Sequence, residues 1–114
     1  MLPSVNENTF RKEVLLSSQP VLVHFWAPWC DLCRMINPML EQLRSSFDKP
    51  VKLVYVNADD NFKLANTYRL RTLPTLLFFE GGSLQKRLDN FQGRDGILAL
   101  LNQTMNADSK EKNI

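Results

Sequence analysis

The chain has little of what several specialised classes of protein depend on. Its 114 residues include only two cysteines and one histidine, and its net charge is +2. Two cysteines cannot form the multi-bridge framework of a small secreted scaffold. Lys and Arg are scattered among acidic residues instead of forming a basic stripe, so we expect no nucleic-acid partner. The apolar runs are far shorter than the ~18 residues that a membrane-spanning helix needs, so we expect no membrane partner either.

The remaining composition is that of an ordinary soluble domain. Apolar residues make up 44% of the chain and charged residues 23%, and this length supports a single hydrophobic core. The first residues lack a basic start followed by an apolar block, which argues against a secretory signal and favours a cytoplasmic or organelle-matrix location. We predict one domain over residues 1–106 and a flexible polar tail over residues 107–114.

A strand, a helix and a second strand follow one another in the middle of the chain. Residues 20–27 (PVLVHFWA) and 51–59 (VKLVYVNAD) are short runs rich in β-branched and aromatic residues, which is typical of buried strands. Between them, apolar residues at helical spacing predict an α-helix with one buried face that continues, kinked, past Pro38. These residues are Ile36, Leu40, Leu43 and Phe47. The order favours a βαβ unit with parallel strands.

Further elements are expected on both sides of this unit. Before it, we predict an edge strand near residues 2–5 and a short helix capped by Asn8. After it come a short helix within residues 61–70, two antiparallel strands joined at Gly81-Gly82, and a last helix near residues 97–105. The whole order predicts an α/β fold, a three-layer sandwich whose central mixed β-sheet is covered by helices on both faces.

The stretch WAPWCDLCRM, residues 26–35, holds both cysteines. Thiols three positions apart on the first turn of a helix lie on the same side and near enough to form a disulfide. Cys30 falls at the helix N-terminus, where unpaired N–H groups and the positive end of the helix dipole stabilise a thiolate. We therefore expect Cys30 to be the nucleophile and Cys33, one turn deeper, to be the resolving thiol.

Two other interpretations of the cysteine pair are weaker. A structural disulfide across CxxC closes too short a loop to constrain the unfolded chain much. A structural zinc site usually needs four Cys or His ligands, whereas this chain offers two cysteines and His24. A dimer that shares a metal or an iron–sulfur cluster between two CxxC motifs remains an alternative.

Three features together resemble the thioredoxin family, over residues 5–105. They are FWAPWCDLC followed by RMINP, then the LPT at residues 73–75, then the glycine of FQGRDG at Gly93. They occur in the order and spacing of that family, and a CxxC beside a βαβ pattern points the same way. The resemblance implies the thioredoxin fold and a protein disulfide reductase that works through Cys30 and Cys33.

The resemblance also implies a substrate-binding surface around Cys30. Pro74 should follow a cis peptide bond and face the cysteines, and the backbone of Leu73 should be offered to a substrate strand. Together with Trp29 and Gly93, these residues would form a shallow apolar surface that binds an extended protein segment.

The dipeptide between the cysteines departs from the family, which mostly has Gly-Pro where this chain has Asp31 and Leu32. Leu32 restores a backbone N–H that proline would lack, and this donor is expected to stabilise the reduced form. Asp31 places a negative charge beside the thiolate, which works the other way, but solvent screening should limit its effect.

Two further departures concern the strands below the cysteines. His24 stands where the family usually has a buried aspartate, and Tyr55 stands where it commonly has a lysine. Imidazole titrates near neutrality, so His24 is a candidate general base for Cys33, although a hydrogen-bonded core histidine is the simpler role. Removal of a buried carboxylate removes a repulsion that penalises the thiolate, so we predict a pair less reducing than that of ordinary thioredoxin.

The sequence therefore predicts a thiol–disulfide oxidoreductase with no bound cofactor and no metal. We expect disulfide-containing protein substrates, recharging by an NADPH- or ferredoxin-dependent thioredoxin reductase, and a monomer. The alternative is a non-catalytic binding module of the same fold that holds a partner in the groove around Pro74. The intact CxxC argues against that alternative.

Overall fold

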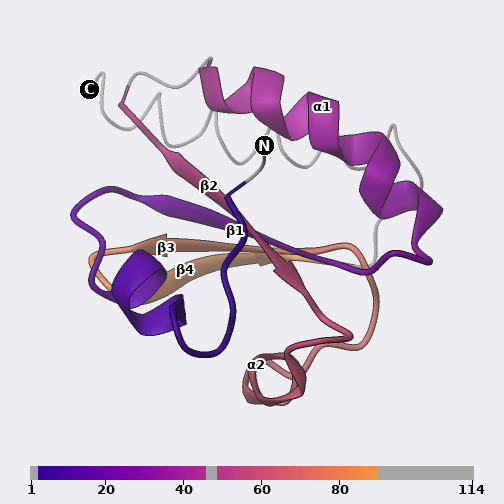
Figure 1. Ribbon diagram of the computed structural model, residues 1–114. Coiled ribbons are helices and arrows are strands. Elements are labelled where there is room, and N and C mark those ends of the chain that lie inside the picture. Colours follow the sequence, from indigo (N-terminus) through magenta and orange to yellow (C-terminus); the bar gives the residue numbers. More distant parts are fainter. Residues whose placement is uncertain (1–2, 46–48, 90–114) are drawn as a thin grey trace.

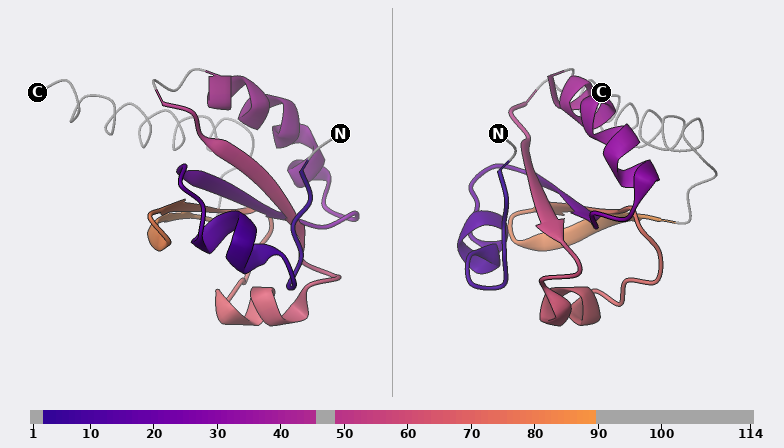
Figure 2. Two further views of the ribbon diagram at one scale, coloured as in Figure 1. Left: turned by 60° about the vertical axis from the view of Figure 1, so that its left-hand side comes forward. Right: turned by 45° about the vertical axis from the view of Figure 1, so that its right-hand side comes forward.

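The computed structural model describes residues 3–45 and 49–89, which form three layers. A β-sheet lies in the middle, and α1 (Asp31–Ser45) crosses one of its faces (Figure 1). The π-helical turn η1 (Arg11–Leu15) and the helix α2 (Phe62–Thr67) lie on the opposite face, as two further views also show (Figure 2). The predicted three-layer α/β architecture is thereby confirmed.

The described strands form a mixed sheet in the order β2-β1-β3-β4. Their bounds are Val21–Trp26 for β1, Lys52–Asn57 for β2, Thr75–Glu80 for β3 and Ser83–Leu88 for β4. β1 and β2 are parallel, whereas β3 is antiparallel to both β1 and β4. Because β1 is central and leads directly toward α1, its carboxyl end brings the cysteines to one edge of the sheet.

Both faces of the sheet are packed, because successive side chains of a strand point to opposite sides. The face under α1 buries Leu22, Leu53 and Leu76 against the helix residues Ile36 and Leu40. The opposite face buries another set against η1 and α2, namely Val23, Phe25, Val54, Val56, Leu77, Phe10, Val14 and Leu64. Burial on both faces explains why β1 and β2 are almost continuously apolar.

Helix α1 runs through Pro38 without a break, as predicted. Proline removes one backbone donor from a helix interior. Packing offsets that loss here, because Ile36, Met39 and Leu40 remain buried on the side facing the sheet. Burial of each such side chain contributes about 1.5–3 kcal/mol.

The prediction of an edge strand near residues 2–5 overestimated the extent of β-structure there. In the described part of that segment, Ser4 forms a single parallel bridge with Tyr55. The backbone N–H of Val5 donates to the carbonyl of Tyr55 at 2.8 Å, and the N–H of Tyr55 donates to Pro3 at 2.9 Å. The N-terminal segment therefore lies beside β2 without extending the sheet by a full strand.

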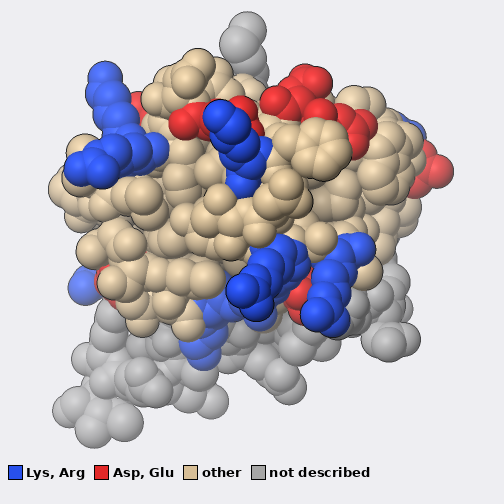
Figure 3. Space-filling model, turned by 90° about the horizontal axis from the view of Figure 1, so that it is seen from below, with Lys and Arg blue, Asp and Glu red and all other residues tan. Residues whose placement is uncertain are grey.

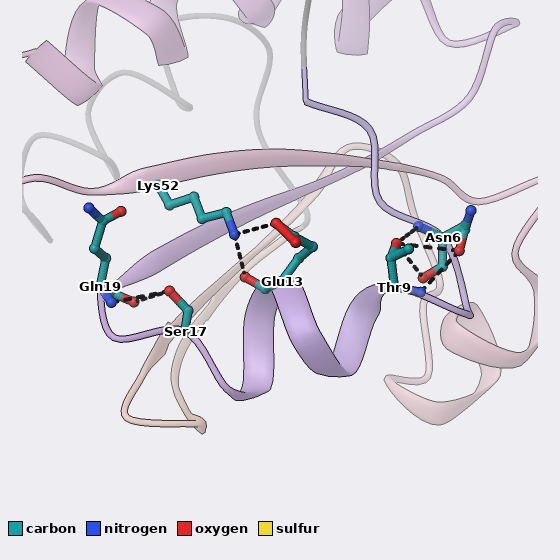
Figure 4. A network of polar contacts seen from close by, with 6 residues as sticks. All are labelled: Asn6, Thr9, Glu13, Ser17, Gln19 and Lys52. Carbon is teal, nitrogen blue, oxygen red and sulfur yellow. Dashed lines mark hydrogen bonds and ion pairs between the residues drawn. The ribbon is translucent and has the colours of Figure 1, made fainter.

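The prediction that Asn8 caps the first helix was wrong. The side-chain oxygen of Asn6 accepts hydrogen bonds from the backbone N–H groups of Asn8, at 2.8 Å, and of Thr9, at 3.1 Å. Figure 4 shows the contact between Asn6 and Thr9. Asn6 precedes the turn and can therefore reach these donors, whereas Asn8 lies inside the turn. At the other end of this segment, Lys52 of β2 ties η1 to the sheet through Glu13 (Figure 4).

The predicted hairpin at Gly81-Gly82 is confirmed. The two glycines have φ angles of +61° and +81°, a region in which side chains other than glycine are strained. A Cβ atom on Gly82 would lie 2.7 Å from the carbonyl oxygen of Leu15, whereas one on Gly81 would meet nothing within 4 Å. The hairpin therefore approaches the end of η1 closely at Gly82.

Several predictions fall outside the described residues: the last helix near residues 97–105, Phe47, Gly93 and the tail over residues 107–114. Within the described ranges, no helix is both long and apolar enough to cross a membrane.

Candidate active site

Cys30 and Cys33 form a disulfide where the chain passes from β1 into α1, with Cα atoms 5.3 Å apart. The carbonyl of Cys30 accepts the backbone N–H of Arg34 at 3.3 Å, so Cys30 flanks the first turn of the helix. Its sulfur also accepts the N–H of Cys33 at 3.1 Å, as a side-chain cap does at a helix N-terminus. Cys30 thus occupies the position at which a thiolate is stabilised.

The two sulfurs differ in their surroundings, as the predicted roles require. Cys33 is fully buried, whereas Cys30 retains 6% exposure. Both pack with Ala27 against the edges of Trp26, Leu32 and Leu73. The Cys33 N–H is the donor that contacts Cys30 Sγ in this oxidised state. The expected contribution of Leu32 concerns the reduced state and stays a prediction.

Arg34 links the residues on the two sides of Cys30. Its guanidinium donates to the carbonyl of Pro28, which precedes Cys30, and to the carboxylate of Asp31, which follows it. The Asp31 and Arg34 side chains are 84% and 56% exposed. The negative charge that Asp31 places beside the nucleophile is therefore solvated and opposed by a cation, and both effects weaken it.

Trp29 is exposed beside Cys30, with 67% of its surface accessible. Its indole N–H donates to Asp59 Oδ2 at 3.0 Å. Asp59 follows β2, and the sequence interpretation did not single it out. Its position could have suggested a role, because the carboxyl ends of the parallel strands β1 and β2 meet at the same edge of the sheet.

The segment before β3 completes the described part of the site. The Leu73–Pro74 peptide bond is cis, as predicted. Leu73 packs against the cluster that contains both cysteines, and the buried Thr75 donates through its hydroxyl to the Thr72 carbonyl at 2.7 Å. This arrangement places the segment beside the disulfide, whereas Gly93 is outside the described residues.

Comparison with known proteins agrees with this geometry. The family model described as Thioredoxin matches residues 2–103. Thioredoxin 1 of Nostoc sp. is 46% identical over 78 residues, which cover 68% of this chain and 73% of that protein. Thioredoxin 1 of Synechococcus elongatus is 44% identical over 79% of this chain and 81% of its own length. Thioredoxin of Rickettsia felis is 32% identical over 92% of this chain and all of its own length.

The chain belongs to the thioredoxin family. It is a thiol–disulfide oxidoreductase that reduces protein disulfides, with the redox-active pair at Cys30 and Cys33. In each cycle the dithiol becomes a disulfide while the substrate disulfide becomes two thiols, so the protein must be reduced again before the next turnover.

Below the cysteines, His24 lies opposite Tyr55 in the parallel register of β1 and β2. Their ring centroids are 5.4 Å apart and the rings meet edge to face. His24 is fully buried and Tyr55 is 3% exposed. Both are polar residues under α1, on the same face of the sheet as Leu22 and Leu53.

The expectation that His24 titrates near neutrality was wrong. Burial lowers the pKa of His24 to about 3, and the side chain of Asn37 opposes this shift to a lesser degree. The imidazole is therefore neutral at physiological pH, and it adds no charge to the region below the cysteines. It retains a lone pair that can accept a proton transiently.

Several buried polar atoms have no hydrogen-bond partner in the described part of the chain. They are both ring nitrogens of His24, Asn37 Oδ1, Tyr55 Oη and Trp26 Nε1. Buried polar atoms are normally paired, so these unpaired ones require an explanation. Asn37 was not a sequence candidate, although its place one turn after Cys33 was visible in the sequence.

On the face of the molecule opposite α1, the charged side chains of the described residues form no single patch of one sign (Figure 3). From the side of the molecule opposite α1, Lys and Arg lie in separate groups, with acidic side chains near several of them (Figure 3). Within residues 3–45 and 49–89, no group of three or more His, Cys, Asp or Glu side chains is placed to hold a metal ion.

Proposed function

We propose that this thioredoxin is tuned to be less reducing than ordinary members of its family. The observation that carries the proposal is the neutral, fully buried His24 at the position where the family usually has an aspartate. A buried carboxylate repels a nearby thiolate, and a neutral imidazole does not. The reduced form is therefore stabilised relative to the disulfide, which makes the pair a weaker reductant.

A redox titration against glutathione tests this proposal. We expect a midpoint potential above about −270 mV, which is typical of thioredoxin. The matched variant is His24→Asp, which restores the acidic residue and should lower the potential toward that value. A wild-type potential at or below −270 mV, or no shift in His24→Asp, contradicts the proposal.

We further propose that His24 is the base that receives the proton of Cys33 when the mixed disulfide is resolved. His24 precedes the cysteines on β1, and it faces Asn37, which lies one helical turn after Cys33. A neutral imidazole can accept a proton on one nitrogen while it releases one from the other. His24→Ala should slow the resolution step near neutral pH, whereas unchanged kinetics would leave His24 as a core residue only.

The substrate is proposed to be an extended segment of a disulfide-containing protein. This proposal is supported by the exposure of Trp29, which precedes Cys30 in the chain, and by the packing of Leu73, which precedes Pro74, against the cysteine cluster. Gly93 is proposed to complete this surface on family resemblance. We propose recharging by an NADPH- or ferredoxin-dependent thioredoxin reductase, a monomeric state and a cytoplasmic location.

The alternative is a thioredoxin-fold binding module whose thiols contribute little catalysis. Insulin reduction, measured with dithiothreitol or with a thioredoxin reductase as electron donor, distinguishes the disulfide reductase from the binding module. We expect turnover that is lost in Cys30→Ser. Binding of partners without turnover would favour the alternative.

A further inference from the structure

The buried position of His24 raises the question of where the proton of Cys33 goes, and this question rests on the proposed role of His24 as the base. Both residues are fully buried. Because burial disfavours the charged imidazole, His24 can hold the proton only briefly. An efficient resolution step therefore needs a route from His24 to solvent.

Helix α1 presents a row of polar side chains toward this region. Cys33, Asn37 and Glu41 are spaced by four residues, so they lie along one side of the helix. Asn37 acts on the pKa of His24, and Glu41 acts on the pKa of Tyr55. Tyr55 is also buried in one cluster with Ile36, Met39 and Leu40, which are the neighbours of Asn37 and Glu41 along the helix.

On the sheet side of the interface with α1, the polar side chains lie next to one another. His24 and Tyr55 are direct neighbours in the register of β1 and β2, with ring centroids 5.4 Å apart. Among the described residues, the ring nitrogens of His24, Asn37 Oδ1 and Tyr55 Oη are buried without hydrogen-bond partners. The His24 nitrogens and Tyr55 Oη are therefore available to exchange a proton through a small side-chain rotation or one bridging water, and Asn37 Oδ1 can accept a hydrogen bond.

The outer end of this row reaches the surface. The Glu41 side chain is 34% exposed, and its carboxylate forms an ion pair with Arg44 at 2.9 Å. Burial, and next the charge of Glu41, raise the pKa of Tyr55 to about 12, while Arg44 lowers it to a lesser degree. The phenol thus stays protonated at neutral pH, and it can donate one proton while it accepts another.

We propose that Tyr55 and Glu41 are positioning residues that carry the proton of Cys33 from His24 to solvent. In this step the Cys33 thiolate attacks Cys30 Sγ of the mixed disulfide. The Cys30–Cys33 bond forms, the bond from Cys30 to the substrate sulfur breaks, and the substrate leaves as a thiolate. The Cys33 sulfur is oxidised and the substrate sulfur is reduced. The Cys33 proton moves through His24 and Tyr55 to Glu41, and the substrate thiolate takes a proton from solvent.

The test separates the two chemical steps in one stopped-flow experiment. Reduced protein reacts with the aromatic disulfide 5,5′-dithiobis(2-nitrobenzoate), and the absorbance records release of one thiolate as Cys30 forms the mixed disulfide and of a second as Cys33 resolves it. Glu41→Gln and Tyr55→Phe should slow the second phase at least about tenfold near neutral pH, at the low end of what a positioned base contributes. The first phase should not change.

The controls separate proton transfer from general damage. Glu80→Gln removes an exposed carboxylate at the far end of β3 and should leave both phases unchanged. Glu41→Asp should restore much of the second phase. Raising the pH until Cys33 ionises directly should remove the difference between Tyr55→Phe and wild type. Tyr55→Phe retains the ring and removes only an unpaired hydroxyl, so its Tm should not fall.

Each result of this experiment either supports or overturns the proton route through Tyr55 and Glu41. If the rate of the second phase is the same in wild type, Glu41→Gln and Tyr55→Phe, the proton route is overturned, whereas the disulfide reductase activity is not called into question. Equal slowing of both phases would overturn it too, because the defect would then lie in the cysteine pair as a whole. If the second phase is unchanged in His24→Ala, the base role of His24 fails and the route fails with it.

Discussion

Trp29 and Asp59 are 30 positions apart in the chain, yet the indole N–H of one donates to the carboxylate of the other at 3.0 Å. The tryptophan is too exposed to be held by packing alone. The hydrogen bond therefore fixes the orientation of the largest apolar side chain beside the nucleophile. It also joins the segment before α1 to the segment after β2.

Loss of this hydrogen bond should weaken substrate binding more than chemistry. In Asp59→Ala the indole is released, and we expect KM for insulin to rise about threefold to tenfold with little change in kcat, in line with a hydrogen bond to a charged group at a partly exposed site. Steady-state insulin reduction measures both constants. Asp60→Ala removes the adjacent carboxylate as a matched control, and an equal effect in that variant would contradict the role of the indole bond.

The buried His24 should make the fold sensitive to acid. Its folded-state pKa, about 3, lies below the ordinary value, near 6.5. Between these values the unfolded chain binds a proton that the folded chain does not, so the free energy of unfolding should fall as pH falls from about 6.5 toward 3, by on the order of 4 kcal/mol over the whole window. Urea unfolding at several pH values measures this. His24→Leu should have a flatter profile in that window, and parallel profiles would contradict the assignment.

The Glu13–Lys52 contact should contribute stability that also disappears in acid. Lys52 Nζ donates to Glu13 Oε1 at 2.7 Å and to the Glu13 carbonyl at 2.9 Å. Hydrogen bonding and the charge of Lys52 lower the pKa of Glu13 below its ordinary value of 4.5. The carboxylate therefore stabilises the fold above pH 4.5, and this effect is lost as pH falls through the lower folded-state pKa.

Glu13→Gln should accordingly lower the Tm at pH 7, and the difference from wild type should shrink at acidic pH. Thermal unfolding followed by circular dichroism measures it. Glu80→Gln is a suitable control because Glu80 is an exposed carboxylate on another strand. A Tm difference that persists unchanged in acid would show that the ion pair is not its cause.

The two turn glycines should respond differently to alanine. Both have positive φ, but only Gly82 approaches another backbone, at Leu15. We expect Gly81→Ala to cost about 1 kcal/mol of strain and Gly82→Ala about 1–3 kcal/mol more, because the new methyl group would force the hairpin away from η1. Denaturant unfolding of the pair measures this difference, and equal losses would mean that the contact with Leu15 yields easily.

Local patterns were enough to predict most of the described fold. The apolar runs around Val23 and Val54 gave the two parallel strands, and the glycine pair gave the hairpin. The errors came from competition among similar side chains at short range. Asn6 and Asn8 both suit a cap, and only the position of the turn shows which of them reaches the N–H groups.

The parts of the candidate site formed by residues close together in the sequence could be predicted. The parts formed by residues that meet only in the folded chain could not. The spacing of Cys30 and Cys33 identified the redox pair directly. Asp59 and Glu41 approach Trp29 and Tyr55 only after the strands and α1 pack together. The pKa of His24 was misjudged for the same reason, since the sequence does not state how completely a side chain is enclosed.

The guanidinium of Arg34 joins Pro28 to Asp31, on either side of Cys30, by contacts that involve neither sulfur. The loop and the first helical turn are thus fastened to each other on the solvent side, whichever oxidation state the pair is in. We therefore expect little backbone rearrangement when the S–S bond opens, so that the oxidised and reduced forms should present a similar outline to a partner protein.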